Sequence, residues 1–155
     1  MVSRAWIDDF NDIIRDVIFA DDELRSLMLL PEDIDILTFI DSYFIEGEGG
    51  STVLVDEPVR IVYGTFAIGN AGNPYVTRNI LSFDIYVRKE DAHNVENDRL
   101  VKRTQLITAR LINLLTAKRY HGVYRFWVEG EGTKFTSTIG YSRYNVNFGF
   151  EKVYG

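Results

Sequence analysis

The amino-acid sequence predicts an α+β fold in which N-terminal helices and one central helix cover one face of a mostly antiparallel four-stranded sheet. Three observations indicate this fold class. Helical periodicity dominates up to about residue 45, strand-like alternation dominates from about residue 57, and one long amphipathic segment interrupts the alternation near residue 100. The predicted order is therefore helices followed by β-β-α-β-β. A length of 155 residues fits a single domain, 1–155, made of an N-terminal helical part at 1–45 and an α+β core at 57–154.

The N-terminal part is predicted to contain three helices. The first begins near Ser3, a suitable N-cap, and ends near Phe19. Its apolar side chains follow the spacing of one helical face, at Trp6, Phe10, Ile13, Ile14 and Val17. A short second helix at 22–29 stops before Pro31. Residues 36–45 are predicted to form a third helix, with Thr38 or Asp35 as its cap.

The core is predicted to contain four strands and the clearest helix of the chain. The strands are expected at 59–63, 78–88, 123–129 and 141–154. Glycine-rich loops are expected at 46–52, 69–74 and 129–134. The helix is expected at 97–117, and Gly122 lies just past its end. Its buried stripe consists of regularly spaced residues, namely Leu100, Thr104, Ile107, Leu111, Leu114 and Leu115.

Composition and motifs exclude several kinds of active site. The chain has no cysteine, which excludes thiol nucleophiles, iron–sulfur clusters and disulfide scaffolds. Its two histidines, His93 and His121, have neither a nucleophile motif beside them nor metal-ligand spacing. No glycine-rich run matches a phosphate-binding loop. We therefore predict no catalytic residue, no cofactor and no metal site, and a protein that is not an enzyme. No apolar stretch reaches the ~18 residues of a membrane helix, so a soluble protein is expected.

Charge is distributed unevenly along the chain, whose net charge is −6. Residues 1–58 carry three basic residues against fifteen acids, whereas residues 59–155 carry fourteen basic residues against eight acids. Such asymmetry indicates either two faces of one domain that attract each other or a surface made to meet other copies of the chain. Both interpretations stay open. The pI near 4.9 argues against tight nonspecific binding of nucleic acid by the whole molecule.

The predicted helix at 97–117 carries a basic face. A helical projection places four basic residues opposite the buried stripe, with Leu106 among them: Arg99, Lys102, Arg103 and Arg110. This face could be solvated, could contact an acidic partner, or could face passing nucleic acid. The acidic partner would be the first helix of a neighbouring copy, with Asp8, Asp9, Asp12 and Asp16. In that interpretation these nine residues form the subunit interface, and charge reversal at Arg103 and Arg110 abolishes assembly without disturbing the fold.

Three pieces of the core together resemble a known protein family. They are the strand ending in DIYVRKED, the helix opening with NDRL, and the closing run GYSRYNVNFGFEKVY. These pieces are similar to the tail-terminator, or tail-completion, proteins in the neck of long-tailed bacteriophages and prophages. The resemblance covers about residues 57–154 and includes the order of the elements, with an N-terminal helix in front.

This resemblance implies a structural role without catalysis or cofactor. Such proteins form a ring, commonly of six copies, that caps the head-proximal end of the tail tube. The ring stops tube polymerisation and offers a docking surface to the head, and DNA passes through its lumen without specific binding. The implied partners are other copies of the chain, the tail-tube protein and the head-connector or head-closure protein, with no membrane. The implied location is the tail neck of the virion, and the host cytoplasm during assembly.

Two other functions stay open from the sequence. The first is a head-closure or adaptor protein of the same neck, which has similar size and composition but docks to the portal side. The second is a small hydrolase or nucleotide-binding domain, which rests only on the glycine-rich runs and the scattered acids. Binding to tail tubes rather than to DNA-filled heads would separate the tail terminator from the head-closure protein.

Overall fold

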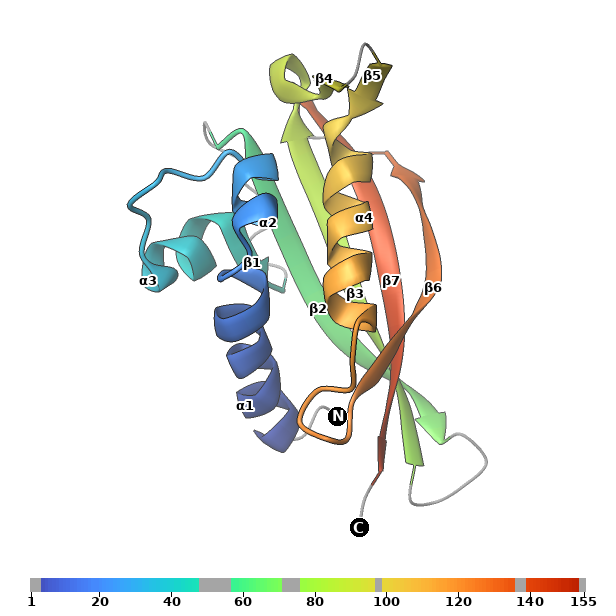
Figure 1. The fold of residues 1–155 in the computed structure, drawn as a ribbon. Helices are drawn as coiled ribbons and strands as arrows, with labels where there is room; N and C mark the ends of the chain where they lie inside the picture. The colour runs from blue at the N-terminus through green and yellow to red at the C-terminus, as the bar shows by residue number, and fades with distance from the viewer. Residues whose placement is uncertain (1–3, 48–56, 71–75, 97–98, 136–138, 154–155) are drawn as a thin grey trace.

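The chain folds as an α+β structure whose helices cover one face of a mixed sheet (Figure 1). A computed structural model describes residues 4–47, 57–70, 76–96, 99–135 and 139–153. The α-helices are α1 (Arg4–Ile13), α2 (Asp22–Leu27), α3 (Ile36–Thr38) and α4 (Arg103–Thr116). Shorter turns are π-helical at Ile14–Ile18 and Phe39–Tyr43 and 3-10 helical at Lys89–Asp91. The strands are β1 (Phe44–Glu46), β2 (Val59–Asn70), β3 (Val76–Arg88), β4 (His93–Glu96), β5 (Arg99–Lys102), β6 (Arg125–Lys134) and β7 (Tyr141–Val153).

The main sheet has five strands in the order β1-β2-β3-β7-β6, so the prediction of four strands is wrong. The four predicted strands are present and antiparallel, and β1 adds a parallel edge strand beside β2. The end of the predicted helix at 36–45 forms this strand. At Phe44 the backbone leaves the helical region, and its ring stacks on Tyr63 of β2 at a centroid distance of 4.9 Å. Burial of Phe44 beside β2 therefore outweighs the helical tendency of the segment.

The N-terminal helices pack into the same core as the sheet. Trp6, Phe10, Ile13 and Ile14 are buried as predicted, but the next fully buried residue is Ile18 rather than Val17. The π-helical turn at Ile14–Ile18 adds a residue to the turn and so rotates the apolar face by one position. Of the two caps considered for the third helix, Asp35 is the one observed, because its carboxylate accepts the Thr38 N–H at 2.7 Å. Ser3 lies outside the described residues.

The long helix begins six residues later than predicted, at Arg103. Residues 99–102 form β5 instead, which pairs with β4 in a two-stranded hairpin separate from the main sheet. Leu100 was expected in the buried stripe of the helix, but its side chain is 72% exposed on β5. Thr104, Ile107, Leu111 and Leu115 are buried as predicted. No helix in the described ranges is both long enough and apolar enough to cross a membrane.

The predicted loop at 129–134 is also wrong, because these residues continue β6 to Lys134. Gly130 pairs with Asn147 and Gly132 with Asn145 of β7, after a register shift between Val128 and Gly130. Long-range pairing with β7 therefore overrides the turn tendency of the glycines. The other two predicted loops lie mostly outside the described residues, although β1 includes Glu46 and β2 extends through residues 69–70.

The face of the sheet that the helices leave uncovered is built in cross-strand rows. One row joins Phe66 of β2, Ile80 of β3, Gly149 of β7 and Trp127 of β6, which are direct register partners. Trp127 lies across the backbone of Gly149, where a Cβ atom would stand 2.4 Å from Cε2 of the indole. The indole N–H donates to Oε1 of Glu129 at 2.6 Å. Glycine at position 149 thus allows the indole to pack against the sheet.

Replacing Gly149 by alanine is expected to lower the free energy of unfolding by about 1–3 kcal/mol, because the new methyl group displaces the Trp127 ring. Gly64 of β2 is the matched control, since an added Cβ there meets no atom within 4 Å. Gly64→Ala is expected to change stability by less than about 1 kcal/mol. Urea unfolding followed by tryptophan fluorescence measures both variants. Equal stability of Gly149→Ala and the wild type would contradict the packing argument.

Candidate functional site

The basic residues predicted to share one helix face lie in two different elements. Arg99 and Lys102 are on the hairpin strand β5, and both are exposed. Arg103 and Arg110 are on α4 and are only partly exposed. Leu106, predicted to sit among the four, is half-buried on α4. The prediction of a continuous basic strip on a single helix is therefore wrong, because β5 ends at Lys102 and α4 begins at Arg103.

The two arginines of α4 bind within their own chain. Arg103 donates from Nε to the Asp91 carbonyl at 2.8 Å and from Nη1 to the Leu27 carbonyl at 3.0 Å. Arg110 donates from Nε and Nη2 to the two carboxylate oxygens of Asp21, at 2.8 and 2.5 Å. Charge reversal at these positions is therefore expected to disturb the fold, contrary to the expectation from the sequence, and would not test assembly alone.

Asp21 connects α4 to the N-terminus of α2. While one carboxylate oxygen receives Arg110 Nε, it also accepts the Leu24 N–H at 2.8 Å and so caps α2. The Arg110 hydrogen bond and the Leu24 N–H hold the pKa of Asp21 below its ordinary value, against the opposing effect of burial. The same pairing raises the pKa of Arg110. This bidentate ion pair is a structural contact between the acidic and basic parts of the chain.

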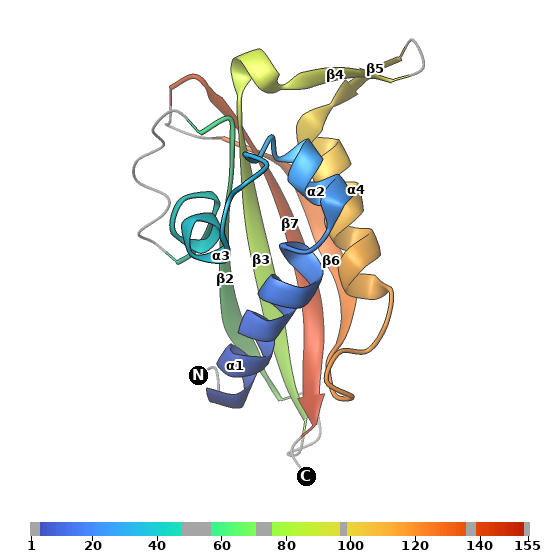
Figure 2. The same ribbon diagram turned by 60° about the vertical axis from the view of Figure 1, so that its left-hand side comes forward.

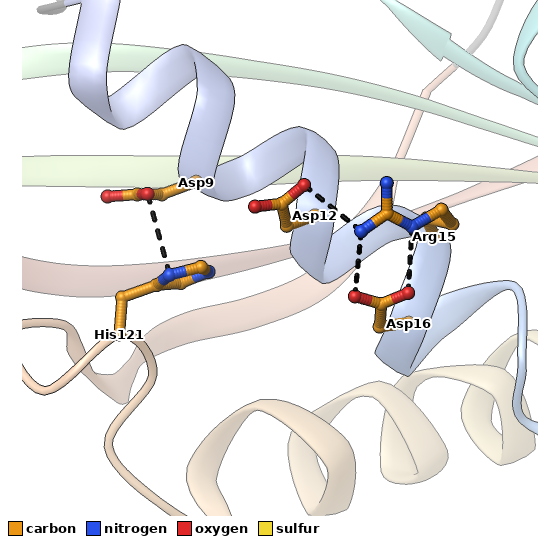
Figure 3. A network of polar contacts seen from close by, with 5 residues as sticks. All are labelled: Asp9, Asp12, Arg15, Asp16 and His121. Atoms are coloured by element: carbon orange, nitrogen blue, oxygen red, sulfur yellow. Dashed lines mark hydrogen bonds and ion pairs between the residues drawn. The ribbon is translucent and has the colours of Figure 1, made fainter.

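Asp9 and Asp12 of α1 and Asp16 of its π-helical turn are engaged in the polar contacts that Figure 3 draws. Asp16 receives Nε of Arg15 at 2.8 Å, and Asp12 receives Nη2 of the same guanidinium at 3.2 Å. Asp9 lies 3.5 Å from Nδ1 of His121. Asp8, the fourth predicted residue, is exposed on α1. The predicted acidic surface therefore exists, but part of its charge is balanced locally.

Asp9, Asp12 and His121 place potential metal-ligand atoms within 4.8 Å of one another. Other contacts already explain the position of these groups. Asp9 accepts the hydroxyl of the buried Tyr124 at 2.8 Å, and Asp12 is paired with Arg15. The cluster is thus a polar network that ties α1 to the turn before β6, and it gives no independent indication of a bound cation.

The β4–β5 hairpin projects from the end of the sheet, as Figure 2 shows. It is anchored at its base, where the Arg103 N–H donates to the Ala92 carbonyl at 2.8 Å. An isolated two-stranded hairpin is marginally stable in water, and this one carries an exposed leucine at position 100. The sequence prediction missed the hairpin because it assigned the second strand to the helix. The described part of the hairpin lies outside the main sheet and exposes Leu100, so it is a surface suited to contact another molecule.

Arg110→Gln is expected to reduce the free energy of unfolding at neutral pH by about 1–3 kcal/mol, because Asp21 loses its bidentate partner. Since the pKa of Asp21 is lowered in the fold, this stabilisation is present above the ordinary value of ~4 and is lost as the pH falls below it. The gap between wild type and variant should therefore shrink from pH 6 to pH 3. Urea titrations across this range measure it, with the exposed Arg119→Gln as a control that should show no such gap.

Asp9→Ala is expected to destabilise the chain by about 1–2 kcal/mol, because the buried hydroxyl of Tyr124 loses this acceptor. In a Tyr124→Phe background, which has no hydroxyl, the same substitution should cost less. A double-mutant cycle of unfolding free energies measures the difference. Additive effects of the two substitutions would show that the hydrogen bond contributes nothing.

Comparison with known proteins assigns no family to this arrangement. A scan against protein-family models finds no match to the chain. A search of curated proteins also finds no matching sequence. The function of the chain is therefore inferred from its residues and surfaces, and the projecting hairpin together with the acidic side of the N-terminal helices is the candidate functional site.

Proposed function

We propose that the chain is a non-enzymatic, ring-forming neck protein of a long-tailed bacteriophage or prophage, which caps the head-proximal end of the tail tube. The β4–β5 hairpin carries this proposal. It projects from the end of the sheet (Figure 2) and is separate from the main sheet. Leu100 on β5 is 72% exposed. An element of this kind is stabilised when it packs on a partner molecule.

Charge supports contact between unlike surfaces of identical copies. The hairpin exposes Arg99 and Lys102, whereas α1 and α2 expose several acids, among them Asp8, Asp22 and Glu23. Attraction between two different patches of the same molecule produces head-to-tail association, which closes into a ring when the rotation between neighbours allows it. The resemblance of residues 57–154 to tail-terminator proteins supports the neck as the place of this ring.

In this role the ring performs three tasks. One face binds the last layer of tail-tube subunits and stops their polymerisation. The opposite face offers a surface to the head-closure protein, and the lumen lets DNA pass without specific binding. The ring, proposed as a hexamer, belongs to the virion neck and assembles in the host cytoplasm. The net charge of −6 favours a surface that does not hold DNA tightly.

Deleting the chain from the phage or prophage that encodes it is expected to give tail tubes of uncontrolled, excessive length, because tube subunits continue to add. Electron microscopy of the tubes measures the length distribution, and supplying the wild-type chain from a plasmid should restore a uniform length. Tubes of normal length beside heads that fail to join would instead indicate a head-closure protein. Normal, infectious particles would contradict any role in the neck.

A further inference from the structure

We infer that the β4–β5 hairpin of one copy docks into a groove between α1 and the Phe39–Tyr43 turn of the next copy. Leu100 enters the apolar floor of this groove, and Lys102 lies against its acidic rim. The inference rests on the proposed ring and names the two surfaces that join neighbouring subunits. The residues named for the two surfaces belong to different parts of the fold.

The groove is a hollow of about 430 Å³ between the first helical segment and the segment from α3 to β1. Its apolar lining combines residues of the π-helical turn after α1 with residues of the α3 segment, including Ile14, Ile36 and Ile40. Ile40 is 38% exposed although its neighbour Phe39 is buried in the core. An exposed isoleucine at the side of a hollow provides an apolar contact for an incoming side chain.

The rim of the groove is acidic. Asp12, Asp41 and Glu46 contribute carboxylates, and Arg15 is the one basic residue in its lining. Arg15 is already bound to Asp12 and Asp16, so its charge is balanced by its own helix. The carboxylates of Asp41 and Glu46 are exposed. The groove therefore fits a ligand that presents an apolar side chain next to a positive charge, and it repels nucleic acid.

The hairpin presents that combination on one face. Side chains alternate along a strand, so Leu100 and Lys102 of β5 lie on the same side. Their cross-strand partners in β4 are Val95 and His93. Leu100 is 72% exposed and Lys102 is exposed, so both are accessible to a partner. This face thus presents Leu100 nearer the tip and Lys102 at the base, and it complements the groove in both respects.

The hairpin of the same copy does not fill the groove. Figures 1 and 2 show the hairpin at the end of the sheet where α4 begins, projecting away from α1 and α3. The occupant is therefore the hairpin of a second copy. Because hairpin and groove are different surfaces, each copy can give one hairpin and receive another. This heterologous contact continues from copy to copy until a ring closes.

Single cysteine variants test this contact directly, since the chain has no cysteine of its own. Leu100→Cys is mixed with Ile40→Cys under mild oxidation, with one variant carrying a mass tag. Docking raises the effective concentration of the two thiols, so the mixed disulfide is expected to form about tenfold faster or more than with the control Leu37→Cys. Leu37 is 66% exposed in the same segment and is not part of the groove lining. Rates are normalised to the reaction of each thiol with a small alkylating reagent.

Equal normalised rates for the Ile40 and Leu37 partners would overturn the inference, as would faster coupling of Leu100→Cys to itself. Lys102→Glu in the hairpin variant is expected to slow the cross-link, and Asp41→Lys in the groove variant is expected to restore it. No effect of Lys102→Glu would overturn the proposed charge pairing.

Tail length is a separate measurement. A specific cross-link together with normal tail length in the deletion strain would support the contact and contradict the neck role. Excess tail length without a specific cross-link would support the neck role and contradict the contact.

Discussion

Trp6 joins the first helix to the last strand, and the layered arrangement depends on this contact. Its indole stacks on Phe150 of β7 at 4.2 Å and on Phe10 of α1 at 4.9 Å, with Tyr124 edge-on at 5.1 Å. Aromatic clusters of this kind combine a large buried apolar area with preferred ring geometries. The contact holds α1 against the same face of the sheet that α4 covers. Because the helices lie on that one face, the opposite face, the groove beside α1 and the hairpin beyond α4 remain available at the surface.

The parts of the fold that could be predicted from the sequence are those whose pattern is local and long. The alternation in β3 and β7 and the apolar stripe of α4 from Thr104 onward are of this kind. The errors occur where a distant partner decides the structure. Phe44 ends a helix because Tyr63 lies beside it, and Gly130 continues a strand because β7 pairs with it. Leu100 fitted a helical stripe by spacing alone, but it lies on β5, which pairs with β4.

The sequence predicted which charged residues occur in each part of the chain, but not how they are arranged in space. The sequence correctly indicates that acids gather in the first part and basic residues in the second. It cannot show that Arg103 reaches the Leu27 carbonyl, 76 positions away, or that Arg110 pairs with Asp21, 89 positions away. Two of the four predicted basic residues, Arg103 and Arg110, therefore bind groups of their own chain. The residues left at the surface, Arg99 and Lys102, gain their position from the hairpin.

The edge strands of the main sheet affect whether copies of the chain can associate by strand pairing. At one edge, β1 pairs with Ile61, Val62 and Tyr63 of β2. At the other edge, β6 has a register shift between Val128 and Gly130 and carries the exposed acids Glu129 and Glu131. A bent, charged strand is a poor template for another strand. Pairing of strands at the sheet edges of successive copies would build an open-ended fibre. Heterologous side-chain contacts instead close into a ring when the rotation between neighbouring copies allows it. The bent and charged edge at β6 therefore disfavours fibre growth through strand pairing.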